Sequence, residues 1–110
     1  MSPFTTADTV PWTELGDGIR RKVLAHTPDL MSVLVGFDKG AVGTPHAHDA
    51  HTQIAYVVSG SFQATVGGES RVLRVGDCFV AAPHTLHGVV ALEQGSALLD
   101  KCSPRRDDYL

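Results

Sequence analysis

The chain has 110 residues, of which 43% are hydrophobic, and a formal net charge of −3 with its six histidines counted as neutral. This length predicts a single domain spanning residues 1–110. The two short basic runs, Arg20–Lys22 and Arg105–Arg106, form no basic stripe, so the composition disfavours nucleic-acid binding. No segment reaches the ~18 consecutive apolar residues of a membrane helix, and no secretory signal is recognisable. We therefore expect a cytoplasmic protein that binds neither nucleic acid nor membrane.

Residues 1–12 are rich in Thr and Pro and are predicted to form an arm that lies on a partner or on an edge strand. After them, short runs of strand-forming residues alternate with turns rich in Gly, Pro and Asp. The predicted strands are Ile19–Leu24, Met31–Phe37, Gln53–Val58, Ser61–Val66, Arg71–Val75, Cys78–Ala82, Gly88–Leu92 and Ala97–Cys102, with a further segment around His46. The pattern predicts an all-β fold, either a closed antiparallel barrel or a double-sheet jelly roll. A β-sandwich without a site would show much the same pattern.

The two cysteines, Cys78 and Cys102, could form a disulfide in principle. Cytoplasmic proteins keep their thiols reduced, so we expect both to be free.

Histidines and a glutamine are spaced as metal ligands along these strands. His46 and His48 are two residues apart, and in a strand such residues project to the same face. Gln53 begins the next strand, and His87 follows a later strand and a turn. Two ligands from one strand, one from its neighbour and one from a distant strand would form a metal cage. A single histidine in a β-protein is more often a surface or hydrogen-bonded residue, so the full spacing carries the prediction.

That spacing resembles the cupin superfamily. The first cupin motif reads Gly40, His46, His48, Gln53 and Gly60, and the second reads Gly76, a short strand, Pro83 and His87. The resemblance implies a cupin-type antiparallel β-barrel with one divalent metal ion, held by His46, His48, Gln53 and His87. The family usually has Glu where this chain has Gln53. Three imidazoles and one amide suit Zn, Ni, Fe, Mn or Co, and leave the positive charge of the ion available to attract an anionic ligand.

Two other histidines, His51 and His84, lie close to the ligand segments. Each could be a fifth ligand, a hydrogen-bond partner of a ligand or a residue at the rim of the site. The sequence favours the last two roles.

The C-terminal segment holds the candidate catalytic residues. Strand alternation places Leu98, Asp100 and Cys102 on one face. If that face is the barrel interior, burial would raise the pKa of Asp100 towards a range useful for proton transfer. The alternative is that Asp100 points outward and that the tail is a solvated terminus.

This segment also resembles the small cupins of the KdgF pectin-degradation group, whose chains end in D-x-F-x-P-x-R-x-D-F-L. The matching residues are Asp100, Pro104, Arg106, Asp108 and Leu110, with Tyr109 and Cys102 at the two aromatic positions. The resemblance implies an enzyme that linearises 4,5-unsaturated uronates from pectin or alginate, with Arg106 binding the carboxylate and Asp100 moving a proton. Alternatives are a metal cupin acting on another small anionic or polycarbonyl compound, as a cyclase or dioxygenase, or a non-catalytic sugar-binding cupin. Because sheet edges need covering, we expect a homodimer.

Overall fold

The computed structural model describes residues 2–110, and its regular secondary structure is almost entirely β-strand. In that part of the chain the elements are η1 (Ala7–Thr9), β1 (Thr13–Gly16), β2 (Ile19–Thr27), β3 (Leu30–Phe37), β4 (Val42–His46), β5 (Thr52–Ser59), β6 (Ser61–Val66), β7 (Glu69–Arg74), β8 (Cys78–Ala81), β9 (His87–Ala91), β10 (Ser96–Ser103) and η2 (Asp107–Tyr109). The predicted strands are present. Strand β1 was not predicted, because its four exposed residues show no apolar alternation.

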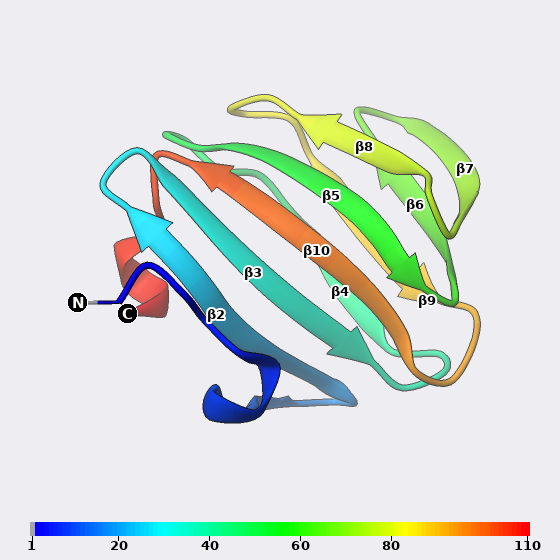
Figure 1. The fold of residues 1–110 in the computed structure, drawn as a ribbon. Helices are drawn as coiled ribbons and strands as arrows, with labels where there is room; N and C mark the ends of the chain where they lie inside the picture. Colours follow the sequence, from blue (N-terminus) through cyan, green and yellow to red (C-terminus); the bar gives the residue numbers. More distant parts are fainter. Residues whose placement is uncertain (1) are drawn as a thin grey trace.

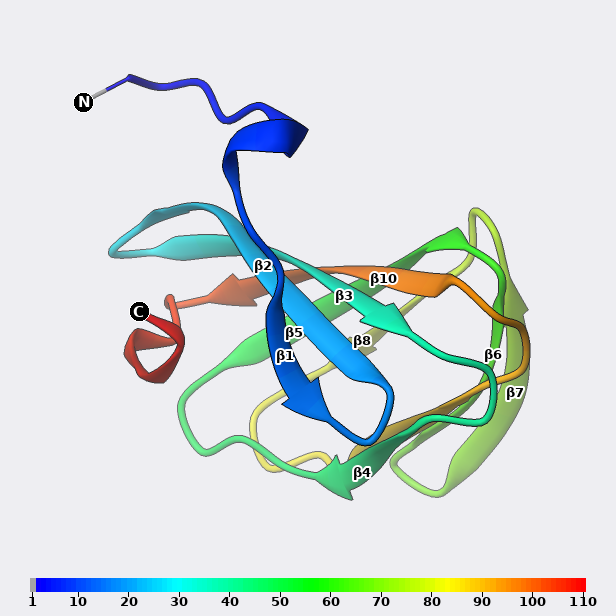
Figure 2. The ribbon, with the colours of Figure 1, turned by 90° about the horizontal axis from the view of Figure 1, so that it is seen from below.

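The strands form two antiparallel sheets that enclose the interior. The six-stranded sheet has the order β1-β2-β3-β10-β5-β8, and the four-stranded sheet has the order β4-β9-β6-β7. Figure 1 shows the larger sheet in front of the smaller one, and Figure 2 shows the interior between them. The all-β jelly-roll barrel predicted from the sequence is confirmed.

The core lies between the two sheets and follows from strand alternation. In β5, Ala55 and Val57 are fully buried, whereas Ile54 and Tyr56, which alternate with them, are more than 40% exposed. The main apolar cluster comprises Phe37, Ala41, Ala55, Val57, Phe62, Ala64, Val89, Ala91 and Leu98. A second cluster of Met31, Val33 and Cys102 packs against Tyr109, near the C-terminus. Alternation therefore places apolar side chains inside the barrel, and it turns one face of β5 and one face of β10 towards the barrel interior.

One tight turn, at Gly60, leads the chain from the six-stranded sheet to the four-stranded sheet. Gly60 connects β5 to β6 with φ of +69°, a left-handed conformation that favours glycine. A Cβ atom at this position would lie 2.8 Å from Cα of the fully buried Ser96. Ser96 Oγ donates to the carbonyl of Glu93 at 2.9 Å. The crossing between the sheets therefore requires a residue without a side chain.

The chain ends lie against the larger sheet. In the predicted arm, of which Met1 lies outside the described residues, Thr5 Oγ1 donates to the carbonyl of Leu24 at 2.7 Å, so the segment runs along β2. Element η2 lies at the same end of the barrel as the loops after β4 and β8 (Figure 2). Cys78 is an exposed free thiol and Cys102 a buried one. No helix within residues 2–110 is long and apolar enough to cross a membrane.

Candidate metal centre and active-site cavity

Three of the predicted ligands, His46, His48 and His87, converge at one end of the barrel. Their ring centroids are 4.7 Å apart for His46 and His48, 4.4 Å for His46 and His87, and 5.2 Å for His48 and His87. One nitrogen from each ring lies within 4.8 Å of the other two. A single ion at about 2.1 Å from each nitrogen could be shared after small rotations of the rings. The arrangement is compatible with a divalent metal.

Backbone carbonyls determine which nitrogen of each ring faces the centre. His46 Nδ1 lies 2.8 Å from the carbonyl of Thr44, and His87 Nδ1 lies 3.0 Å from the carbonyl of Thr85. Because a carbonyl only accepts, both Nδ1 atoms carry the proton and both Nε2 atoms have a free lone pair. His87 Nε2 is buried without a hydrogen-bond partner among residues 2–110. Such a lone pair inside a protein is suited to a metal.

The predicted fourth ligand, Gln53, completes the cluster from the opposite sheet. Its Oε1 atom lies 3.2 Å from His48 Nε2, and both side chains are buried. An amide oxygen and an imidazole nitrogen are donors that first-row divalent metals accept. The residues present therefore fit the metal that the cupin resemblance implies.

The expected placement of the ligands on strands was wrong in two respects. Strand β4 ends at His46, so His48 lies in the following loop, which begins the crossing to the other sheet. The neighbour of β4 is β9, not β5, and His46 is paired directly with His87. Gln53 belongs to the six-stranded sheet. The cluster is therefore built between the sheets rather than along one of them.

Burial keeps two of the imidazoles neutral. The pKa of His48 is lowered by burial first and then by the charge of Arg106. The pKa of His87 is lowered mainly by burial, against the opposing effect of its hydrogen bond to Thr85. Neutral imidazole is the form that binds a metal, so both histidines are in the binding form at neutral pH.

Asp100 points into a cavity of about 130 Å³ that it shares with ligand residues. The lining is Leu15, Ile19, Arg21, Val35, Phe37, Gly43, His46, Gln53, Phe79, His87, Gly88, Val89, Leu98, Asp100 and Tyr109. Asp100 Oδ1 is enclosed and has no hydrogen-bond partner in the described part of the chain. Burial raises the pKa of Asp100 to about 7, although Gln53 and Arg106 favour its ionised form. The carboxyl group can thus either donate or accept a proton near neutral pH.

The second predicted catalytic residue, Arg106, is held by its own tail. Its Nη2 donates to Asp108 Oδ2 at 2.7 Å, its Nε donates to Asp108 Oδ1 at 3.3 Å, and its Nη1 donates to Tyr109 Oη at 2.7 Å. The guanidinium lowers the pKa of the Asp108 carboxyl. Arg106 is not among the residues that line the cavity, yet its charge acts on the pKa values of Asp100 and His48. It therefore makes the end of the barrel attractive to anions.

The remaining histidines of the ligand segments lie outside the cluster. His51 Nε2 is 3.3 Å from the carbonyl of Arg105, which joins the loop after β4 to the C-terminal segment. His84 is exposed and lies 3.4 Å from Asp49. Both occupy the rim of the site.

Two cavity residues, Arg21 and Tyr109, were not predicted from the sequence as site residues. The signal for Arg21 is its position between Ile19 and Val23, which alternation places on the same face of β2. Tyr109 gave no periodic signal, because it belongs to the short helix η2.

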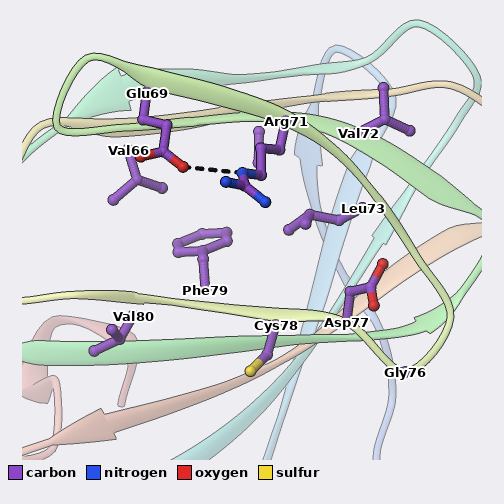
Figure 3. Close-up of a pocket in the computed structure, with 11 residues that line it drawn as sticks. Val66, Glu69, Arg71, Val72, Leu73, Gly76, Asp77, Cys78, Phe79 and Val80 are labelled. Carbon is purple, nitrogen blue, oxygen red and sulfur yellow. Dashed lines mark hydrogen bonds and ion pairs between the residues drawn. The ribbon is translucent and has the colours of Figure 1, made fainter.

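A larger cleft of about 710 Å³ lies between the free edges of β7 and β8. Figure 3 shows Glu69 and Arg71 above the ring of Phe79, and the two charged groups form an ion pair at 2.9 Å. Both side chains are more than 70% exposed, so their charges are solvated and satisfied by each other. Phe79 also lines the smaller cavity. Within residues 2–110, the buried side-chain atoms without a hydrogen-bond partner are His87 Nε2 and Asp100 Oδ1, and both residues line the smaller cavity. We therefore place the candidate active site there.

The chain belongs to the cupin family, since residues 33–99 match the cupin domain model. It is 55% identical to pectin degradation protein KdgF of Dickeya dadantii (strain 3937), over all of both chains. The solved structure of KdgF from a Halomonas species is similar, with a TM-score of 0.97 and 54% identity, also over all of both chains. An RmlC-like cupin from Shewanella frigidimarina has a TM-score of 0.94 and 39% identity, over 100% of this chain and 97% of the other.

Proposed function

We propose that this cupin is a metal-dependent enzyme that linearises 4,5-unsaturated uronates, the monosaccharides released from pectin or alginate by lyases. The observation that carries the proposal is the unpartnered Asp100 Oδ1 in the same cavity as His46, His87 and Gln53. The full-length similarity to pectin degradation protein KdgF supports it. The substrate is a small anion, which suits a site whose charged neighbour is Arg106.

The metal ligands in this proposal are His46, His48, Gln53 and His87. When bound, the ion supplies a Lewis acid that polarises a sugar oxygen. The four donor groups are all neutral, so they leave the charge of the ion uncompensated and favour an anionic substrate. The identity of the metal, among Zn, Ni, Fe, Mn and Co, is open to direct measurement.

The proton transfers are assigned to Asp100. In an unsaturated uronate the anomeric hydroxyl loses its proton and becomes the aldehyde oxygen at C1, while the bond between C1 and the ring oxygen breaks. The ring oxygen keeps the electron pair of that bond and takes up a proton, which gives an enol at C5. The enol becomes a ketone when its oxygen loses a proton and C4 gains one. No atom is gained or lost, so the reaction is an isomerisation. A carboxyl group with a pKa of about 7 can both accept and return such a proton.

We assign to Arg106 the attraction of the sugar carboxylate. Its positive charge, rather than its hydrogen bonds, is its main contribution to substrate binding. Three of its donor positions are engaged by Asp108 and Tyr109. Its charge nevertheless reaches the ligands and Asp100, and so lowers the free energy of an anion bound nearby.

A homodimer and a cytoplasmic location are part of the same proposal. Exposed apolar side chains on the outer face of the larger sheet support a dimer: Ile54, Tyr56 and Val58 of β5 and Val80 of β8. A second copy would remove this surface from water. Sedimentation at two protein concentrations measures the mass of the particle, and a monomer at micromolar concentration would contradict the dimer.

The proposed reaction is tested with purified protein and 4,5-unsaturated galacturonate. The conjugated double bond absorbs ultraviolet light, and its loss reports turnover. We expect the absorbance to decay faster with protein than without it. A chelator should stop the reaction and added metal should restore it. Tight binding of the sugar without any decay would instead indicate a sugar-binding cupin.

A further inference from the structure

Arg21 in β2 points towards the interior of the barrel, unlike Arg20 beside it. Ile19 and Val23, two positions before and after Arg21, pack against the two apolar clusters. Alternation along the strand places Arg21 on the same face. The register agrees, because Arg21 lies opposite Val35, which packs against both clusters. Arg21 accordingly lines the cavity that holds Asp100.

The guanidinium of Arg21 has no carboxylate partner within residues 2–110. Arg20, on the outer face of the same strand, pairs with Glu14 at 3.3 Å and Asp38 at 3.0 Å. An arginine directed into a partly apolar cavity is normally paired, because removing its charge from water is costly. Within the described residues, the inward-facing Arg21 thus lacks a carboxylate partner, whereas the outward-facing Arg20 has two.

The Arg21 guanidinium lies over the ring of Tyr109. The guanidinium carbon lies 3.8 Å from the centre of the Tyr109 ring, and that of Arg106 lies 4.2 Å from the same ring. A guanidinium stacked on an aromatic ring donates its hydrogen bonds outward in its own plane. The N–H groups of Arg21 therefore remain available to a bound molecule, whereas three donor positions of Arg106 are engaged by Asp108 and Tyr109.

We propose that Arg21 binds the carboxylate of the sugar through two parallel hydrogen bonds and so determines the specificity for an acidic substrate. This inference rests on the proposed function and refines it. Arg21 donates the hydrogen bonds to the carboxylate. Arg106 acts on the carboxylate only through its positive potential, and it orients Tyr109 through its hydrogen bond to the Tyr109 hydroxyl. The chemistry fits, because the planar guanidinium matches a carboxylate in a way that a lysine does not.

The test compares Arg21→Gln with the matched control Arg20→Gln, which removes the same charge from the outer face of the same strand. KM and kcat are measured with unsaturated galacturonate and with its neutral methyl ester. We expect Arg21→Gln to raise KM for the acid by about 10- to 100-fold, to change kcat much less, and to abolish the preference for acid over ester. Arg20→Gln should keep the wild-type preference. An Arg21→Gln variant that still prefers the acid as strongly as the wild type would overturn the proposal.

Binding is measured separately from turnover, with galacturonate and uncharged galactose as probes in calorimetry. The wild type could bind galacturonate, and lose that binding in Arg21→Gln, without turning over the unsaturated sugar. That result would reject the proposed reaction but support the role of Arg21. Equal binding of galacturonate by wild type and Arg21→Gln would reject that role, whatever the turnover. Circular dichroism checks that each variant is folded. If Arg21→Gln does not fold, Arg21→Lys replaces it. This variant should bind galacturonate more weakly than the wild type does and should bind galactose equally well. Unchanged galacturonate binding in Arg21→Lys would reject the role of Arg21.

Discussion

His46 of β4 and His87 of β9 are direct cross-strand partners, with ring centroids 4.4 Å apart. Each ring is held by the carbonyl of the residue two positions earlier, Thr44 for His46 and Thr85 for His87. The backbone of one ladder thus orients two lone pairs towards the same region. Burial, and to a smaller extent the neighbouring His46, lowers the pKa of His87 and so disfavours a positive charge on the His87 ring. The His87 ring is consequently in the neutral form that binds a metal.

Replacing His48 should remove metal without unfolding the barrel. His48 lies in a loop outside both apolar clusters, so His48→Ala leaves the core intact. We expect metal affinity to fall by at least about tenfold, since even changes to groups that only support metal ligands have effects of that size. Elemental analysis after dialysis gives the metal content. His84→Ala is the control, because His84 is exposed at the rim, and it should keep the wild-type content. Stoichiometric metal in His48→Ala would argue against the site.

Replacing Asp100 should abolish turnover but not metal binding. Asn keeps the shape of the side chain and cannot transfer a proton, so kcat should fall by about 100-fold or more. Kinetics with unsaturated galacturonate and elemental analysis of the same sample measure the two effects. Undiminished turnover in Asp100→Asn would remove this residue from the mechanism.

The buried carboxyl of Asp100 should also make the stability of the metal-free protein depend on pH. Its pKa rises from 3.8 in a model compound to about 7 on folding, so between these values the folded state holds more protons than the unfolded state. Stability from this group is therefore full below pH 4 and falls as the pH rises to 7. Asp100→Asn lacks this effect. Relative to wild type, it should be more stable at pH 8 than at pH 5, by on the order of a few kcal/mol.

Urea unfolding of chelator-treated wild type and Asp100→Asn at both pH values checks this expectation. The lowered pKa values of His48 and His87 act in the opposite direction, since stability from these groups rises as the pH passes the ordinary histidine pKa. Comparison of the two proteins at each pH largely cancels that contribution. A stability difference that does not change between pH 5 and pH 8 would contradict the assignment.

The two thiols should differ sharply in reactivity. Burial raises the pKa of Cys102 to about 11, and the nearby Asp100 carboxyl adds to the effect, so little thiolate forms at pH 8. Cys78 is exposed. In the native protein we expect a thiol reagent to label Cys78 alone, and to label both residues after denaturation. Peptide mass spectrometry identifies the labelled sites, and rapid native labelling of Cys102 would be inconsistent with its burial.

Adding a side chain at Gly60 should destabilise the fold more than the same change at Gly95. Both glycines have a positive φ, +69° and +75°, so alanine is strained at each by about 1–2 kcal/mol. At Gly60 the new Cβ would also collide with Ser96, whereas at Gly95 nothing lies within 4 Å. We expect Gly60→Ala to cost about 1–3 kcal/mol more than Gly95→Ala in urea unfolding. Equal costs would show that the Ser96 backbone can move aside.

The sequence predicted the strands and the ligand segments because both depend on local spacing. Alternation in β5 placed Gln53 with Ala55 and Val57, and the two motifs brought out His46, His48 and His87. It did not predict that β4 pairs with β9 while β5 joins the other sheet, because pairing between distant strands depends on packing of the whole barrel. Arg21 was missed for a related reason. Alternation groups Arg21 with Ile19 and Val23, but only the barrel shows that this face of β2 lines the cavity of Asp100.

The central position of β10 has a consequence for how the protein is made. Residues from Ala97 to Cys102 pair with β3 on one side and β5 on the other. Both of these strands leave the ribosome before β10, so until then their facing edges have no partner. Nascent chains stalled before residue 96 should therefore expose adjacent strand edges, the kind of surface on which chains aggregate. We therefore expect the barrel to close, and Asp100 to enter its cavity, only after β10 has been synthesised.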